Sequence, residues 1–171
     1  VGLRDPLQNP DYINLEQLKG VTVEAGPGVV DHGHPEKYID MVHTPAEWTK
    51  SPFGSVKSCA ESLYMTVNLG AKYVVGSVTV WNYYGDTRKY CGQKIALSTT
   101  GDFKGEETVV YDTKKEYGPM EQRSGNNHAF SPTATRFVRY YSSRSTRNGG
   151  VHFLELDIYG YKTPLPNPNY V

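Results

Sequence analysis

The chain has 171 residues, with 18 basic and 18 acidic side chains and therefore a formal net charge of zero. This length fits one domain with a substantial core. A neutral chain lacks the long-range attraction that drives most binding to nucleic acids and anionic membranes, so neither partner is favoured. No apolar run approaches the roughly 20 residues that span a bilayer, and the start at Val1 lacks a signal peptide, so we expect a mature or excised piece of a protein.

The composition favours strands and turns over helices. Aromatic residues make up 12% of the chain, with 14 tyrosines, and glycine and proline are plentiful. Tyrosine together with these helix breakers predicts an all-β domain. Two cysteines, Cys59 and Cys91, form one disulfide if the protein is secreted, or else serve as two buried free thiols that fill apolar space; the sequence leaves both readings open.

The first 60 residues carry the weakest pattern. Residues 1–20 are polar, with two prolines and one helical turn near Leu15, and they read as a leader packed on the domain or as a linker. Residues 21–62 mix short apolar runs with glycine, proline, histidine and charged groups, which predicts a first strand followed by long loops. We expect the domain itself to cover residues 21–162.

From Leu63 onward a period of two is clear. Residues 63–69 alternate apolar and polar side chains up to a turn at Gly70 and Ala71, and similar runs follow at 77–84, 93–98 and 108–111. Five or more short strands at this spacing predict a β-sandwich or a barrel. No internal repeat is visible, which disfavours a propeller or a solenoid.

The stretch from Ala134 to Tyr161 predicts two more strands. In the second, Leu154, Leu156 and Ile158 alternate with aromatic and acidic residues that include Glu155 and Asp157, which predicts a half-buried strand. Residues 163–171 hold three prolines in nine residues and read as an extended tail or linker to a neighbouring domain.

Two loops carry the residue types that a sugar site requires. Sugars pack their C–H faces on aromatic rings, and their hydroxyls take hydrogen bonds from Arg, Asn and Asp. The first loop offers Trp81, Asn82, Tyr83, Tyr84, Asp86, Arg88 and Tyr90. The second loop, between the last two strands, offers Arg144, Arg147 and Asn148, with His152 beside it. The alternatives are that the aromatic residues belong to the core, that Asp86 and Arg88 form an ordinary salt bridge, that the polar loop is merely solvated, and that His152 is a satisfied histidine of the inner rim.

Acidic and histidine side chains gather before the first clear strand. The stretch holds Asp31, His32, His34, Glu36, Asp40, His43 and Glu47. The histidine spacing is a weak match to a zinc site, whereas calcium accepts loop carbonyls beside carboxylates, and Glu155 of the last strand could close such a site. The alternative is a hydrated acidic loop without an ion.

No pattern typical of an enzyme is present. Glu106, Glu107, Glu116 and Glu121 lie in polar stretches without a nucleophile elbow, a zinc-protease motif or a phosphate-binding loop. A small β-domain of this kind is more often a binding module.

The run MTVNLGAKYVVGSVTVWNYY, the middle IALSTTGDF, and the closing ATRFVRYYSS and HFLELDIYGY, over residues 60–161, resemble the discoidin-like β-sandwich superfamily, and within it the family 32 carbohydrate-binding modules. The resemblance implies an eight-stranded jelly roll that binds sugars through loops at one end. It also implies a structural calcium held by an Asp in an early loop and a Glu in the last strand, positions that Asp40 and Glu155 match. The family loop resembles D-G-x-x-x-T-x-W, whereas here Met41 replaces the Gly and the Trp comes one residue late, with Thr44 still offering its oxygens.

The resemblance implies the function that we predict. The chain is expected to be a non-catalytic carbohydrate-binding module of a secreted glycoside hydrolase, with a mono- or oligosaccharide as partner and an attached catalytic domain in the same polypeptide. Family sites use an Arg and an Asn of the central loop, which Arg88 and Asn82 match, and an aromatic of the last loop, which is missing here. The usual galactose preference therefore does not carry over, and galactose- and hexosamine-containing glycans are both candidate partners. The alternative is a discoidin-type adhesion module that binds protein or phospholipid; membrane binding would need exposed apolar side chains, and the predicted loops are polar.

Overall fold

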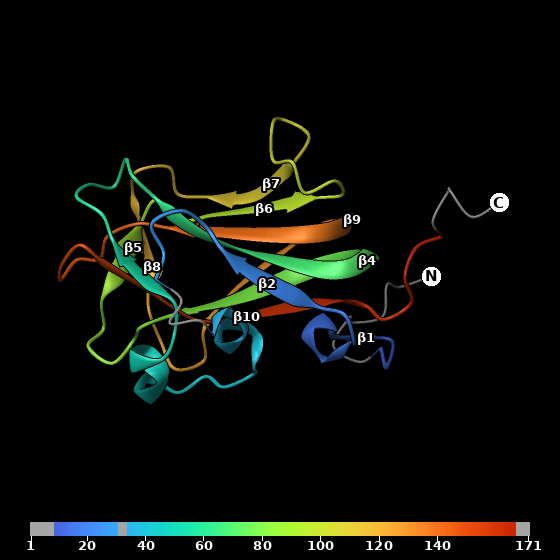
Figure 1. Ribbon diagram of the computed structural model, residues 1–171, viewed down its shortest axis with the longest axis horizontal. Coiled ribbons are helices and arrows are strands. Elements are labelled where there is room, and N and C mark those ends of the chain that lie inside the picture. The colour runs from blue at the N-terminus through green and yellow to red at the C-terminus, as the bar shows by residue number, and fades with distance from the viewer. Residues whose placement is uncertain (1–8, 31–33, 167–171) are drawn as a thin grey trace.

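The computed structural model describes residues 9–30 and 34–166, with only the backbone of Glu47, and forms a two-layer β-sandwich (Figure 1). The predicted all-β sandwich is confirmed, and the helical elements among the described residues are single 3-10 turns. In chain order the elements are β1 (Tyr12–Asn14), η2 (Leu15–Gln17), β2 (Thr22–Ala25), η3 (Pro35–Ile39), η4 (Pro45–Thr49), β3 (Phe53–Ser55), β4 (Leu63–Asn82), β5 (Lys89–Cys91), β6 (Lys94–Ser98), β7 (Thr108–Asp112), β8 (Tyr117–Met120), β9 (Asn126–Ser142) and β10 (Gly150–Tyr161).

Two long strands, β4 and β9, connect the layers. The first half of β4 pairs with β2 and its second half pairs with β10, while β9 follows β4 through both halves. The hydrogen-bonded order is β1-β10-β4-β9-β6-β7, with β2 beside β4 and β3 beside β10, and β5 and β8 form a separate ribbon. The layers therefore share continuous strands at one end of the sandwich.

The turn predicted at Gly70 is instead a bend within β4. Gly70 has a φ of 83°, in the left-handed region that glycine adopts without strain, and the pairing with β9 shifts register between Asn68 and Tyr73. The prediction that a strand ends here was wrong because β9 bends alongside β4 and supplies hydrogen-bond partners on both sides of the irregularity.

The core lies between the layers. Met65, Val67 and Leu69 of β4 alternate with partly exposed neighbours and are almost fully buried, as the period of two predicts. The second half of β4 supplies Val75, Val78 and Val80 from the opposite layer to the same cluster. The alternation that identified the strand in the sequence is therefore the pattern that fills the core.

Strand β10 is buried on both faces, which corrects the prediction of a half-buried strand. Glu155 is 0% exposed and Asp157 is 4% exposed. The reason is that β1 pairs with the end of β10, and η2 and η3 pack against the strand. Leu15 of η2 and Tyr38 of η3 are fully buried, and the Tyr38 ring meets Phe153 edge-on at 5.7 Å between centroids.

The described part of the expected leader, residues 9–20, is thus an integral part of the domain through β1 and η2. At the other terminus, the N–H of Leu165 donates to the carbonyl of Lys72, while residues 167–171 of the expected tail lie outside the described residues. None of the helical elements that the structure describes has the length and apolar character needed to cross a membrane.

Cys59 and Cys91 form a disulfide, the first of the two readings that the sequence left open. It ties the segment before β4 to β5 across a sequence separation of 32 residues. Closing a loop of this size stabilises a fold by about 3–4 kcal/mol in the chain-entropy account. The bond therefore anchors β5, and with it the preceding loop that holds Arg88.

Candidate functional site

Four rings gather where β3, η4, the loop after β4 and the start of β10 meet. Trp48 lies 6.3 Å from Tyr83 and 5.7 Å from His152 between ring centroids, both edge-on, and Phe53 stacks on His152 at 5.9 Å. We call Trp48, Phe53, Tyr83 and His152 the aromatic cluster. Trp48 is 46% exposed, so a large flat ring of this cluster faces solvent.

An open hollow of about 250 Å³ lies on the aromatic cluster, lined by Trp48, Thr49, Phe53 and His152. Burial lowers the pKa of His152, and the nearby positive charge of Arg88 acts in the same direction, so the imidazole is neutral at pH 7. A neutral ring beside an exposed indole gives the hollow apolar walls with polar edges, which suits a ligand with C–H faces and hydroxyl groups.

A charged group adjoins the aromatic cluster through Tyr83. The guanidinium of Arg88 lies 4.9 Å from the Tyr83 ring centroid and donates to both carboxylate oxygens of Asp86, at 2.7 and 2.6 Å. This fork lowers the pKa of Asp86. Arg147 reaches across from the loop before β10 and donates from Nη2 to the carbonyl oxygen of Asp86 at 3.1 Å. The two predicted loops therefore meet, and Asp86 joins them.

Four predicted sugar-binding residues are buried instead, namely Trp81, Asn82, Arg88 and Tyr90. Trp81 packs against His43 with ring centroids 4.1 Å apart, and its indole N–H donates to the carbonyl of Arg123. Asn82 is fully buried and donates to the carbonyl of His152, and Tyr90 is fully buried as well. The sequence analysis placed Trp81, Asn82 and Tyr90 in a loop, whereas β4 continues to Asn82 and Tyr90 belongs to the strand β5.

The remaining predicted residues are spread around the same end of the sandwich. Tyr84 donates its hydroxyl to the carbonyl of His43, beside a second hollow of about 440 Å³ lined by His43, Thr44, Pro45, Tyr84 and Arg123. Arg144 donates to the carbonyl of Lys57 at 2.8 Å. Asn148 is exposed, and its Oδ1 accepts from the N–H of Gly150. These two side chains hold the loop backbone, so their first role is structural.

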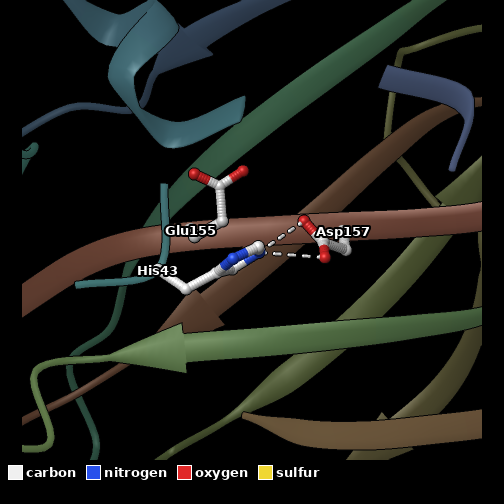
Figure 2. A group of neighbouring side chains, drawn as sticks. All are labelled: His43, Glu155 and Asp157. Atoms are coloured by element: carbon white, nitrogen blue, oxygen red, sulfur yellow. Dashed lines mark hydrogen bonds and ion pairs between the residues drawn. The ribbon is translucent and has the colours of Figure 1, made fainter. Parts of the chain in front are cut away.

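A second group of side chains gathers on the outer face of β10. His43, Glu155 and Asp157 each place a potential metal-ligating atom within 4.8 Å of the others, and Figure 2 shows the His43 ring directed at the Asp157 carboxyl. Nε2 of His43 lies 3.0 and 3.2 Å from the two carboxylate oxygens of Asp157. Glu16 of η2 and Asp40 adjoin them. We call Glu16, Asp40, Glu155 and Asp157 the carboxyl cluster.

The carboxyl cluster holds more negative charge than its surroundings compensate. Burial raises the pKa of Glu155 far above its usual value, and the carboxyls of Glu16, Asp40 and Asp157 push it in the same direction. Burial likewise raises the pKa of Glu16, assisted by the charge of Asp157. Oε2 of Glu155 and Oε1 of Glu16 are buried without a hydrogen-bond donor. Buried carboxylate oxygens of this kind call for a proton or a cation.

The donor set fits a divalent cation. Calcium takes oxygen ligands from carboxylates and backbone carbonyls, and the two unpartnered oxygens supply such groups. Of the three predicted ligands, Asp40 and Glu155 belong to the cluster, whereas Thr44 is exposed and its hydroxyl accepts from the N–H of Ala46. Met41, which stands where the family pattern has Gly, has a φ of 63° and donates its N–H to Oε1 of Glu155. This backbone conformation accounts for the glycine of the family pattern.

The histidine-rich part of the predicted metal stretch contributes little else. Asp31 and His32 lie outside the described residues, and nothing is described of the side chain of Glu47. His34 and Glu36 form an exposed pair, with Nδ1 and Oε1 3.0 Å apart. Of the described side chains of this stretch, those of Asp40 and His43 are brought to the carboxyl cluster.

Sequence reasoning did not assign Trp48 and Phe53 to the sugar site, nor Glu16 and Asp157 to the metal site beside Glu155. Asp157 had a signal, because it lies two residues from Glu155 and therefore on the same strand face. His43 was part of the predicted metal stretch, and Trp48 was noted as the tryptophan of the family loop pattern but not as a sugar contact. Phe53 and Glu16 had no signal, because a three-residue strand and a short 3-10 turn leave no periodicity to read.

The sequence matches no family model and no curated protein. The fold does match solved structures. A family 89 glycoside hydrolase from Clostridium perfringens in complex with PUGNAc superimposes with a TM-score of 0.67 at 18% identity, over 91% of this chain and 16% of that enzyme. The chain therefore spans only a small part of the enzyme's length.

Smaller solved proteins match over most of their length. The CBM32 of AlyQ, solved with 4,5-unsaturated mannuronic acid, has a TM-score of 0.59 at 22% identity, covering 83% of this chain and 95% of that one. A pectin-binding carbohydrate-binding module has a TM-score of 0.61 at 14% identity, covering 88% and 95%. The chain has the fold of these carbohydrate-binding modules. The β-sandwich fold expected from the sequence is thus confirmed.

Proposed function

We propose that the chain is a non-catalytic carbohydrate-binding module that holds a glycan at the aromatic cluster. The observation that carries the proposal is the exposed indole of Trp48, placed edge-on to Tyr83 and His152 over an open hollow. Arg147 and Asn148 of the adjoining loop supply donors and acceptors for hydroxyl groups. Carbohydrate-binding modules among the solved structures of the same fold add support.

Charged side chains form one edge of the proposed site. Arg88 is committed to Asp86 through two hydrogen bonds beside the ring of Tyr83, and Nε of Arg147 lies 3.9 Å from the same carboxylate, so one of the two cations is not neutralised by Asp86. A shallow site of this kind gains little beyond the cost of association, so we expect a dissociation constant on the order of micromolar to millimolar.

The absence of catalysis is part of the proposal. Hydrolysis of a glycoside needs two carboxyl groups that reach the substrate. The carboxyls that converge here, Glu155 and Asp157, are buried on β10 under η2 and η3. Chromogenic glycosides therefore should not be turned over by the isolated chain.

The proposed context is a secreted protein in which the module keeps an attached glycoside hydrolase near its substrate. The disulfide between Cys59 and Cys91 supports an oxidising compartment. The match to one segment of a much longer glycoside hydrolase supports the attachment.

Calcium bound to the carboxyl cluster is the second part of the proposal. Glu155, Asp40 and Glu16 would hold the ion, and Asp157 would add a carboxylate that is now paired with His43. The ion would neutralise the buried carboxylates and fix η2 and η3 on β10, so its role would be structural. An imidazole is a better ligand for zinc than for calcium, so a zinc titration belongs in the same experiment.

A glycan array, followed by calorimetry on the best ligand, tests the binding proposal. Trp48→Ala should weaken binding at least tenfold while leaving the melting temperature within a few degrees of the parent. Tyr117→Ala is the matched control, because Tyr117 is 44% exposed and makes no ring contact among the described residues. Equal affinity of both variants, or silence across the array, would refute the proposed site. Repeating the array after chelation tests whether the ion supports binding.

The adhesion alternative gains one observation from the structure. Met41, Val42 and Trp48 are exposed apolar side chains within one short segment, with Met41 47% exposed. Exposed apolar side chains of this kind insert into membranes or partner proteins. Sedimentation with phosphatidylserine vesicles separates the two functions, because a Met41→Ser, Val42→Ser double variant should lose vesicle binding only if the alternative is correct.

A further inference from the structure

A second cationic group lies on the outer face of the layer formed by β6, β9 and the first half of β4 (Figure 1). The pairing register places Tyr64, Tyr141 and Lys94 in one row across these strands, and Thr66 and Arg139 in the next row. These residues alternate with the buried positions that fill the core, so their side chains point away from it. All of them are partly exposed.

Aromatic rings hold the two cationic side chains of this face in place. The guanidinium carbon of Arg139 lies 4.1 Å from the ring centroid of Tyr64 and 3.9 Å from that of Phe103, so the group is sandwiched between two rings. Its Nε donates to the hydroxyl of Thr66 at 2.9 Å. The ammonium of Lys94 lies 4.3 Å from the ring centroid of Tyr141. Ring contacts of this kind fix long cationic side chains that solvent would otherwise leave mobile.

Neither cation forms an ion pair among the described residues, although the register places Asp112 opposite Lys94 and Glu24 opposite Thr66 on the same face. Nε is the nitrogen of Arg139 that is hydrogen-bonded, which leaves the terminal Nη1 and Nη2 groups available. Two parallel N–H groups are the fork that binds a carboxylate with two hydrogen bonds. Both cations lie within 6.0 Å of the Tyr141 ring centroid, so one ligand can reach both.

Positive charge continues along the same surface. A hollow of about 140 Å³ beside Tyr141 is lined by Lys94, Lys114 and Lys115. Asp112 is the one carboxylate residue on that lining, and its Oδ1 accepts from the N–H of Lys114. An anion bound at Arg139 could therefore extend past Tyr141 toward further lysines.

We propose that Arg139 and Lys94, held by the surrounding rings, form a second binding site that takes the carboxylate of an acidic saccharide such as a uronic acid oligomer. The carboxylate would bind the Nη groups of Arg139 and the ammonium of Lys94, and Tyr141 would lie against the sugar ring between them. Because the cations are already ordered by the rings, binding costs less side-chain entropy than at a free arginine. The saccharide character of the ligand rests on the proposed function, whereas the anion site rests on the geometry alone.

Trigalacturonic acid and its trimethyl ester are the probes, added to the 15N-labelled full chain. The acid should shift the Nε–H resonance of Arg139 and the backbone amides around Tyr141, and the uncharged ester should not. An unmoved Arg139 resonance at millimolar acid would overturn the proposal. Inorganic sulfate at matched ionic strength is the third probe. If sulfate shifts the Arg139 resonance and the acid does not, the site binds a simple anion and the saccharide ligand is refuted.

Variants locate the site and separate it from the aromatic cluster. Lys94→Gln should weaken acid binding about tenfold, and Arg139→Lys, which keeps the charge without the fork, should weaken it by a similar factor. Lys19→Gln, an exposed lysine in the turn before β2, is the control and should bind as the parent does. In Trp48→Ala the Arg139 shift should persist even if glycan binding at the aromatic cluster is lost, so the two proposals can fail independently. Unchanged affinity in both Lys94→Gln and Arg139→Lys would overturn the second site.

Discussion

The carboxyl cluster and a nearby network of amides and hydroxyls are both polar regions buried in the same sandwich, yet the chain completes only one of them. In the network, Asn82 donates to the carbonyl of His152 and accepts from the hydroxyl of Tyr140. Gln93 donates to Tyr140 and to Glu121, and Glu121 accepts the N–H of Asn82. We call Asn82, Gln93, Glu121 and Tyr140 the amide network; none of its buried side-chain atoms lacks a partner among the described residues.

The carboxyl cluster differs in that two of its buried oxygens have no donor. A completed network rigidifies a fold, whereas an incomplete one costs stability unless something from outside the chain fills it. The contrast therefore separates a network that the chain completes from a cluster whose two unpartnered oxygens can take up a proton or a cation.

The largest expected effect is the dependence of stability on pH in the presence of a chelator. Burial and neighbouring carboxyls hold the folded-state pKa of Glu155 above its unfolded value near 4.5, so the folded protein keeps a proton that the unfolded chain releases. Stability is then fully present below pH 4.5 and is lost as the pH rises, at about 1.4 kcal/mol per pH unit for each such group. The free energy of unfolding, measured with urea, should therefore fall as the pH rises from 5 to 8.

Bound calcium should abolish the part of the pH dependence of stability that Glu155 causes. The variant Glu155→Gln should abolish the same part in the absence of calcium. Glu121 provides the internal control. Burial raises its pKa to about 8, so it adds a slope of the same sign between pH 4.5 and 8 that calcium leaves intact and Glu121→Gln removes. A slope that is unaffected by calcium, zinc and Glu155→Gln alike would show that the carboxyl cluster holds no cation.

The next largest loss of stability is expected from a substitution that breaks the amide network. Asn82→Ala removes the partners of the His152 carbonyl and the Tyr140 hydroxyl, and each unsatisfied buried group costs about 1–3 kcal/mol. We expect a loss of about 3 kcal/mol in the free energy of unfolding that calcium does not restore. Asn127→Ala is the matched control, because Asn127 is exposed and donates one hydrogen bond to Thr79, and its loss should stay below about 1 kcal/mol.

A smaller effect comes from one atom of the same network. Tyr140→Phe removes a hydroxyl that donates to Asn82 at 2.7 Å and accepts from Gln93 at 2.9 Å. The expected loss is about 2 kcal/mol with glycan binding unchanged, by thermal and calorimetric measurement. Tyr161→Phe should be neutral, because the Tyr161 hydroxyl has no hydrogen bond among the described residues. Equal losses in the two variants would contradict the role of the network.

The smallest effect concerns the loop beside the carboxyl cluster. Met41 has a φ of 63°, which costs a non-glycine residue about 1 kcal/mol. Met41→Gly relieves this strain but makes the unfolded chain more flexible, so we expect a net gain of no more than about 0.5 kcal/mol in unfolding experiments. Met41→Val, with a branched side chain in the same conformation, should instead lower stability, and a gain from valine would exclude backbone strain at this position.

Much of the fold could be predicted because it depends on a period of two. The alternation in β4, β6 and β10 identified strands and core residues directly. The burial of Glu155 and Asp157 could not be predicted, because it is caused by η2 and η3, which are single turns without a repeating pattern. The bend at Gly70 was taken for a strand end, since a glycine in an alternating run gives the same signal in both cases.

The candidate site was predicted only in part, because the sequence does not show where the pairing of β4 ends. Tyr83, Asp86, Arg88, Arg147 and His152 do gather at one end of the sandwich. Trp81 and Asn82 instead belong to the paired end of β4, where their side chains point to opposite faces of the strand and both are buried. Which of two neighbouring aromatic residues is exposed depends on where a strand stops pairing. That boundary is decided by Phe153 and the rest of β10, about 70 residues later in the chain.

Strand β10 runs from one end of the sandwich to the other. Its first residues adjoin the aromatic cluster, and its last residues pair with β1, where the N–H of Lys162 donates to the carbonyl of Asp11. Twelve residues of extended strand separate these points, a distance of about 36 Å. Residues 11 and 162 thus lie side by side at the end of the sandwich opposite the aromatic cluster. If the aromatic cluster binds a glycan as proposed, a polypeptide connected through this end would lie away from the ligand.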